Sequence, residues 1–282
     1  MCERQAGAGR AVCREEERMT MEATRFNPEL DVHVHPDDLA FSYGEDVFGP
    51  VPEMRRLDAI RPSLRDPDCS GPDPVYGIAM DVGRKEDRAD LNRRMLLFGV
   101  VAYAAGQLGH EPVRSQGHVH AVAPHSGWST PELFEIWEGR AIIYAQESTM
   151  DVPGRCVAIT AAPGDQVVVP PGWAHCLINV DPQRRMVFGA LCVRQYGFVY
   201  DGVRAHGGLA WFPLLTGAGE IRWELNPRYL PSDVRVSGPR DYSELVLRSE
   251  LPSYRQYEEN PEAVEWMSDP GRYQELWNKF GP

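Results

Sequence analysis

The stretches GHVHAVAPHSGWSTPELFEIWEG, residues 117–139, and PGDQVVVPPGWAHCLIN, residues 163–179, decide the fold of this chain. Side chains of an extended strand alternate between its two faces, so His118 and His120 project to one side and Val119 projects to the other. The first stretch therefore predicts a strand that presents two imidazoles to a single point.

The same alternation places a carboxylate in an apolar row. After Pro131, Glu132 shares one face with Phe134 and Ile136, while the other face carries Leu133, Glu135 and Trp137. A buried carboxylate costs several kcal/mol unless a nearby charge neutralises it, and a divalent cation does so directly. The second stretch adds His175 after a Pro-Pro-Gly turn.

These residues predict a site for one divalent transition metal ion, with the ligands His118, His120, Glu132 and His175. Three neutral imidazoles and one carboxylate suit Fe, Mn, Ni, Zn or Cu, and the ligand types alone do not choose among them. A second HxH pair, His33 and His35, lies among Asp and Pro without a matching carboxylate segment, so we expect no metal there.

The pattern along the chain predicts one all-β core with appendages. Between residues 73 and 229, short runs rich in Val, Ile, Phe and Tyr alternate with Gly and Pro turns, which is typical of a barrel or sandwich. We expect a disordered or loosely ordered leader over 1–25 and an irregular arm over 26–72 that wraps the core with short helices at most. Residues 230–282 form a C-terminal extension that we expect to end in two short helices, since Asn or Asp twice precedes a Pro there.

Charge and cysteine content bound the possible partners. The 41 acidic residues outnumber the 29 basic ones and give a net charge of −12, which disfavours a nucleic-acid partner. The six cysteines are scattered without a CxxC pair, as expected for reduced thiols. The N-terminal residues lack the apolar stretch of a signal peptide, and no apolar run approaches the ~20 residues of a membrane span. We therefore expect a cytoplasmic protein without a membrane partner.

Both stretches resemble the two sequence motifs of the cupin superfamily. The first motif is matched by the HxH pair and by Glu132 and Gly139, which have six residues between them. The second motif is matched at every fixed position, namely Gly164, Pro170, Gly172, His175 and Asn179. The resemblance implies a double-stranded β-helix, the jelly-roll barrel of that superfamily. One departure is a longer interval between His120 and Glu132, which we expect to form a loop at the barrel mouth in which His125 approaches the ligand.

Within that superfamily, the chain resembles the archaeal-type glucose-6-phosphate isomerases. The segments RRL (55–57), DPVY (73–76), GHVH, PELFEIWEGRA, VVVPPGWAH, YG (196–197) and NPRY (226–229) occur in the order of that family. The resemblance covers about residues 50–229 and implies metal-dependent interconversion of an aldose phosphate and a ketose phosphate. It also implies a homodimer that pairs through its sheets, with a role in sugar metabolism.

The resemblance carries over to some substrate contacts and not to others. It implies that Tyr76 binds substrate, that Ser115 supplies a hydroxyl where the family has Thr, and that Gly117 lets the backbone approach a phosphate. Near Val100 the chain lacks a second Thr of the family, and near Cys192 and Arg194 it lacks a Tyr and a His. Arg194 is a candidate phosphate or carboxylate ligand in a rebuilt site, and a surface ion pair is its alternative role.

Glu132 and His120 are the candidate catalytic residues. Burial in an apolar barrel is expected to raise the basicity of Glu132, which makes it a candidate base, and simple metal ligation is the alternative. Two other functions stay open: an Fe- or Mn-dependent oxygenase or lyase on the same fold, and a non-catalytic sugar-binding protein. Neither the metal nor the choice between proton and hydride transfer follows from these residues.

Overall fold

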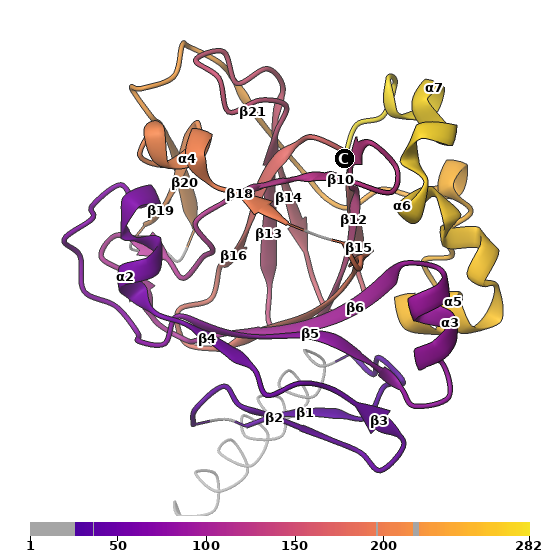
Figure 1. The fold of residues 1–282 in the computed structure, drawn as a ribbon. Coiled ribbons are helices and arrows are strands. Elements are labelled where there is room, and N and C mark those ends of the chain that lie inside the picture. The colour runs from indigo at the N-terminus through magenta and orange to yellow at the C-terminus, as the bar shows by residue number, and fades with distance from the viewer. Residues whose placement is uncertain (1–25, 36, 196, 217–219) are drawn as a thin grey trace, which may run out of the picture.

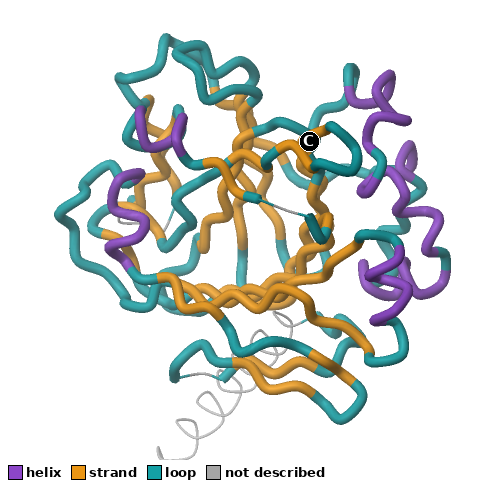
Figure 2. The backbone as a smooth tube through the Cα atoms, in the orientation of Figure 1, coloured by secondary structure: helices purple, strands orange, loops and turns teal. Residues whose placement is uncertain are grey.

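A computed structural model describes residues 26–35, 37–195, 197–216 and 220–282 of the chain. The expected leader over 1–25 lies outside the described residues. Figures 1 and 2 show strands at the centre of the molecule, with the C-terminal helices grouped at one side. Within the described ranges, no helix is both long and apolar enough to cross a membrane.

The larger of two facing sheets has seven strands and carries Glu132. Its strands follow the order β15 (Gln166–Val169), β12 (Glu132–Glu138), β17 (Met186–Val193), β6 (Leu96–Tyr103), β5 (Tyr76–Arg84) and β3 (Val47–Phe48), and β4 (Glu53–Arg55) also pairs with β5. All of these pairings are antiparallel.

The facing sheet has four strands, in the order β16 (Ala174–Asn179), β13 (Ala141–Gln146), β14 (Cys156–Ala161) and β21 (Val234–Ser237). The chain passes from the larger sheet to the smaller one between β12 and β13, returns between β14 and β15, and crosses twice more on its way to β17. This winding is that of a double-stranded β-helix, which confirms the predicted all-β jelly-roll barrel.

Shorter elements complete the rim and the outer layer. The paired short strands are β1 (Val32–Val34) with β2 (Phe41–Tyr43), β7 (Gln107–Leu108) with β8 (Glu111–Pro112), β9 (Val119–His120) with β18 (Phe198–Val199), β10 (Val122–Ala123) with β11 (Trp128–Ser129), and β19 (Trp211–Leu215) with β20 (Ile221–Leu225). The helices are α2 (Leu57–Ile60), η1 (Arg61–Ser63), α3 (Arg88–Arg93), α4 (Asp201–Ala205), η2 (Ser243–Leu245), α5 (Ser253–Glu259), η3 (Pro261–Val264), α6 (Glu265–Ser268), η4 (Pro270–Tyr273) and α7 (Gln274–Trp277).

Strand alternation assigns the side chains of β12 to two different cores. Phe134 and Ile136 pack into the interior between the two sheets, in a cluster that also contains Ile143 of the opposite sheet. Leu133 and Trp137 pack on the outer face of the larger sheet. The alternation expected from the sequence is therefore confirmed, and Glu132 begins the inward row.

The arm over 26–72 is more regular than the sequence indicates. We expected short helices at most, whereas β3 and β4 join the larger sheet and β1 pairs with β2 on its outer face. These strands are two or three residues long, so they are too short to show an alternating pattern in the sequence. The arm thus extends the wall that holds the site.

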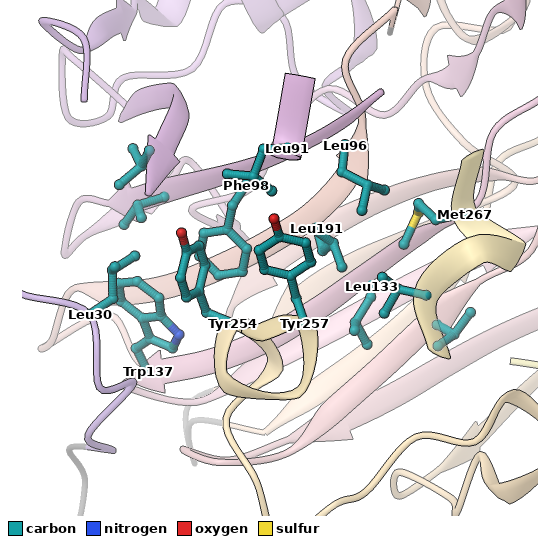
Figure 3. Close-up of a cluster of buried hydrophobic side chains, with 14 of the residues drawn as sticks. Leu30, Leu91, Leu96, Phe98, Leu133, Trp137, Leu191, Tyr254, Tyr257 and Met267 are labelled. Atoms are coloured by element: carbon teal, nitrogen blue, oxygen red, sulfur yellow. The ribbon is translucent and has the colours of Figure 1, made fainter. Parts of the chain in front are cut away.

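The C-terminal extension covers the outer face of the larger sheet. Figure 3 shows Tyr254 and Tyr257 projecting from α5 toward Phe98, and the rings of Phe98 and Tyr254 meet edge to face at 5.2 Å. The extension also adds β21, which runs parallel to β14 and which the sequence analysis did not predict. Tyr254 and Tyr257 are therefore buried against the barrel.

The described cysteines, Cys69, Cys156, Cys176 and Cys192, are all free and buried. This agrees with the expectation of reduced thiols for that part of the chain.

A buried carboxylate fixes α5 to the sheet. Glu135 is 1% exposed and accepts hydrogen bonds from the Ser253 backbone N–H at 2.6 Å, from Trp137 Nε1 at 3.0 Å and from Gln166 Nε2 at 3.1 Å. Burial raises the pKa of Glu135 to about 7, although the three donors act in the opposite direction. The N–H of Ser253 belongs to the first turn of α5, where a helix leaves donors without partners of its own.

Replacement of Glu135 should therefore change how stability depends on pH. The folded pKa lies above the unfolded value of 4.5, so stability from this group is present below about pH 4.5 and is lost as the pH rises through about 7. Relative to Glu135→Gln, the free energy of unfolding of the wild type should fall by about 2 kcal/mol between about pH 5 and about pH 8. Urea unfolding of chelator-treated protein measures this difference.

Glu138→Gln controls for the loss of a carboxylate from β12, because Glu138 lies on the same strand in an ion pair with Arg185. Curves of wild type and Glu135→Gln that stay parallel over this pH range would contradict the expectation.

Candidate metal centre

Four side chains that are distant in sequence meet inside the barrel. The potential ligand atoms of His118, His120, Glu132 and His175 all lie within 4.8 Å of one another. His118 and His175 pair directly in an antiparallel β-bridge. The backbone N–H of His118 donates to the carbonyl of His175 at 3.1 Å, and the N–H of His175 donates to the carbonyl of His118 at 2.9 Å. The backbone pairing of the barrel therefore brings the two sequence motifs together.

The carboxylate of Glu132 lies between the imidazoles. His175 Nε2 lies within hydrogen-bond distance of Glu132 Oε2, at 3.2 Å. His120 Nε2 is 3.0 Å from the same oxygen but is not aligned for a hydrogen bond. His120, Glu132 and His175 are each at most 5% exposed, whereas His118 is half-buried at the side of a pocket.

Hydrogen bonds behind two of the imidazoles orient them. His120 Nδ1 is 3.0 Å from the carbonyl oxygen of Thr130, and His175 Nδ1 is 3.1 Å from that of Trp173. A carbonyl oxygen only accepts, so in both rings Nδ1 donates the hydrogen bond and Nε2 faces Glu132. This is the orientation in which a histidine binds a metal ion through Nε2.

The electrostatics of the cluster favour a neutral imidazole at His118 and an ionised carboxylate at Glu132. Burial, together with the neighbouring His175 and His120, lowers the pKa of His118 well below its ordinary value. Burial alone would raise the pKa of Glu132, but the adjacent His120 and His175 hold that pKa below its ordinary value. The expectation that the barrel raises the basicity of Glu132 is therefore wrong, because it considered burial without the imidazoles.

The residues present fit a divalent metal ion. The buried Nε2 atoms of His118 and His120 have no hydrogen-bond partner among the described residues, and such atoms are costly unless a ligand satisfies them. Three nitrogen donors and one oxygen donor on one side of an accessible pocket match a transition-metal site that keeps positions open for another molecule.

A pocket extends from the cluster into the barrel. Its polar lining consists of Arg55, Tyr76, Tyr103, Ser115, Gln116 and Tyr200, with His118 and Glu132 of the cluster. Its apolar lining consists of Ile78, Met80, Val101, Phe134, Leu177, Phe188, Ala190 and Phe198. The pocket thus joins a candidate metal position to a largely apolar chamber with a few hydrogen-bonding groups.

Two of the expected substrate-binding residues lie in this pocket. Tyr76 is buried and stacks on Tyr103 with ring centroids 4.8 Å apart. Ser115 also lines the pocket, and its oxygen accepts a hydrogen bond from Leu177 N–H at 3.2 Å. Gly117 is not among the lining residues; its φ of +87° and the side chain of Leu209, 2.8 Å from a built Cβ, both require glycine there.

Two other candidates lie away from the pocket lining. Arg194 forms an ion pair with Asp81 at 2.7 Å, which was its alternative role. His125 contacts Gln195 and the backbone oxygen of Ser268, so the mouth loop is tied to the C-terminal extension and His125 does not line the pocket. Tyr196, part of the YG segment, lies outside the described residues.

Arg55, Gln116 and Tyr200 were not identified from the sequence as site residues, although all three line the pocket. Arg55 belongs to the RRL segment that contributed to the family resemblance, and Gln116 stands between two residues that were singled out. Tyr200 carried no signal of its own in the sequence.

The barrel with these four side chains in its interior defines the chain as a cupin. A family profile described as glucose-6-phosphate isomerase (GPI) matches residues 62–229, more than half of the chain. The chain is similar to the glucose-6-phosphate isomerases of Thermococcus gammatolerans and Pyrococcus furiosus, each 27% identical over 157 residues that cover 56% of this chain and 74% of the relative. The chain therefore belongs to the glucose-6-phosphate isomerase family, and it is a sugar-phosphate isomerase.

Solved structures with some likeness include an oxalate oxidase, at a TM-score of 0.33 and 16% identity over 44% of this chain and 54% of that chain. Another is a cupin superfamily protein from Desulfitobacterium hafniense, at a TM-score of 0.23 and 14% identity over 35% of this chain and 67% of that chain.

Removal of two ligands should abolish metal binding. We expect about one equivalent of a divalent metal in purified wild type and less than about a tenth of that in His118→Ala/His175→Ala, since two of four donors are lost. The matched control is His33→Ala/His35→Ala, which removes another HxH pair from the exposed β1 segment. Elemental analysis measures the metal, and circular dichroism verifies that each variant folds. Equal metal in the wild type and the first variant would contradict the assignment.

Proposed function

We propose that the chain interconverts glucose 6-phosphate and fructose 6-phosphate with the help of one divalent metal ion. The observation that carries the proposal is the convergence of His118, His120, Glu132 and His175 at the side of a pocket, in a chain of the glucose-6-phosphate isomerase family. Isomerisation moves the carbonyl between C1 and C2 of the sugar, and negative charge develops on the two adjacent oxygens.

His118, His120, Glu132 and His175 are the residues that would hold the ion, which we propose to be Fe, Mn, Ni or Zn. When bound, such an ion supplies Lewis-acid stabilisation of the charge on O1 and O2. The Thr130 and Trp173 carbonyls fix the rings of His120 and His175, so both ligand atoms are in place before substrate arrives.

We propose Glu132 as the group that carries a proton between C2 and C1, with a second proton passing from O2 to O1. Glu132 is the one carboxylate among the described residues that line the pocket. Its contacts with His120 and His175 hold the carboxylate at the pocket. Transfer of hydrogen as a hydride is the alternative route, and in that route Glu132 serves as a ligand alone.

The remaining polar groups of the pocket would bind the sugar. The Tyr76 hydroxyl and the Ser115 side chain belong to opposite walls, since Tyr76 begins β5 of the larger sheet and Ser115 pairs with Leu177 of β16. A chain of hydroxyls placed between them can exchange hydrogen bonds with both. The apolar residues around them exclude water from the reaction.

A homodimer that pairs through its sheets, in the cytoplasm, remains part of the proposal. The family resemblance supports the dimer. The cytoplasmic location is supported by the described cysteines, which are all free thiols. Light scattering of the purified protein should give about twice the mass of one chain, and a value for one chain would exclude the dimer.

Activity should depend on the metal that is loaded. Chelator-treated protein should convert glucose 6-phosphate to fructose 6-phosphate slowly, and reloading with one of Fe, Mn, Ni or Zn should raise kcat/KM by about 10²-fold or more, since a lost metal removes the main charge stabilisation. A coupled assay under nitrogen measures the product, with mannose 6-phosphate as a second substrate.

Oxygen uptake on candidate substrates, without isomerisation under any metal, would instead favour the oxygenase alternative. Ligand binding without any turnover would favour the sugar-binding alternative.

The route of hydrogen transfer can be tested in deuterium oxide. If Glu132 moves a proton, the product should take up deuterium from solvent, and Glu132→Gln with retained metal should lose about 10²- to 10⁴-fold in kcat, the usual contribution of a general base. Mass spectrometry of the product measures the deuterium. Product free of deuterium at early times would support hydride transfer and remove the base role.

A further inference from the structure

Arg55 brings a positive charge to the wall of the pocket. It ends β4, where it pairs in register with Tyr76 of β5, and its side chain lines the pocket together with Tyr76, Tyr200 and His118. Its Nη2 contacts Glu53 Oε1 at 2.8 Å, but Glu53 is 67% exposed, so water screens this pair. The Nε atom of Arg55 is buried and has no hydrogen-bond partner among the described residues.

Gln116 provides a second unused donor in the same pocket. It is 1% exposed, and its Oε1 accepts a hydrogen bond from Arg204 Nε at 3.1 Å. That bond fixes the orientation of the amide and leaves Nε2, which is buried without a partner among the described residues. Arg204 also lies over the ring of Tyr200 at 5.0 Å, so a second guanidinium supports this part of the wall.

The described pocket lining thus contains two buried donor atoms without hydrogen-bond partners, one on Arg55 and one on Gln116. Glu132 is the one carboxylate among the described lining residues, and it belongs to the candidate metal centre. Buried donors without partners are costly, and they persist where a ligand supplies acceptors. In a chain with a net charge of −12, two guanidiniums beside one pocket require a local explanation.

A phosphate has the complementary chemistry. Its oxygens only accept when it is a dianion, and the planar guanidinium of arginine binds them through paired, charge-assisted hydrogen bonds. The apolar side chains that make up half of the pocket lining, among them Met80, Val101 and Phe188, offer such a group nothing. The part of the pocket wall that Arg55 and Gln116 form therefore suits the charged end of the substrate.

We infer that Arg55 and Gln116 form the phosphate subsite of this enzyme. This subsite anchors the phosphate and thereby directs the C1–C2 end of the sugar to the candidate metal centre. This inference rests on the proposed function. Arg55 is thereby a specificity-determining residue, since an unphosphorylated sugar gains no binding energy from its guanidinium.

The test compares Arg55→Gln with Arg56→Gln. Arg56 is the adjacent arginine, its side chain is 62% exposed, and it does not line the pocket, so it controls for the loss of one positive charge. Arg55→Gln should raise KM for glucose 6-phosphate by about tenfold or more, which is the scale of one lost charge-assisted hydrogen bond, with kcat changed by less than about threefold. Arg56→Gln should stay within about twofold of wild type in both constants.

Inorganic phosphate provides a second readout that does not need turnover. Its inhibition constant, or its dissociation constant from calorimetry, should weaken by about tenfold in Arg55→Gln and by a smaller factor in Arg55→Lys, which keeps the charge and loses the planar fork. The metal content of Arg55→Gln, Arg55→Lys and Arg56→Gln should equal that of the wild type. Gln116→Leu should weaken phosphate binding in the same direction, which keeps the test valid if one variant fails to fold.

Values of KM and of phosphate affinity in Arg55→Gln that match the wild type, while the wild type isomerises its substrate, would overturn the subsite and leave the proposed function intact. A wild type that binds phosphate through Arg55 but isomerises no sugar phosphate would support the subsite and remove the proposed function. A wild type that binds no phosphate would overturn the subsite.

Discussion

The contact between the buried carboxylate of Glu132 and the three imidazoles around it is the interaction on which the rest of the barrel depends. A charge at this depth is tolerable only with close partners, and those partners come from β9, β16 and the segment before β9. A shift of β12 by one residue would turn Glu132 outward and bring Leu133 and Glu135 inward, so the register of the larger sheet and the composition of the cluster determine each other. The cross-strand bridge between His118 and His175 fixes the second half of the arrangement.

The sequence predicted the parts of the fold that follow from local pattern. Alternation placed Phe134 and Ile136 inside and Trp137 outside, and the structure confirms each of these positions. Local pattern failed where pairing is set by distant residues. The strands of the arm are too short to show an alternating pattern of apolar and polar residues. The position of β21 depends on its parallel pairing with β14, which is distant in the sequence. No periodicity within 230–282 reports that pairing.

The same division applies to the site. The four candidate ligands lie in two compact motifs with a recognisable spacing, so their convergence could be predicted before the structure. Arg55 could not, because its place beside Tyr76 depends on the pairing of β4 with β5. Arg194 shows the opposite failure: an arginine near a motif was a reasonable candidate, but Asp81, more than a hundred positions earlier in the chain, pairs with it. Burial and partner choice decide the role of a charged residue, and both are properties of the fold.

The buried thiols give the barrel its own probes of opening. A thiol reacts as the thiolate, and burial raises the pKa of Cys176 to about 12 and that of Cys192 well above its ordinary value. Alkylating reagents therefore reach these side chains only when the surrounding strand separates from its neighbours. Cys176 lies on β16 of the smaller sheet and Cys192 lies on β17 of the larger one, so their labelling rates report separately how often each wall of the barrel opens.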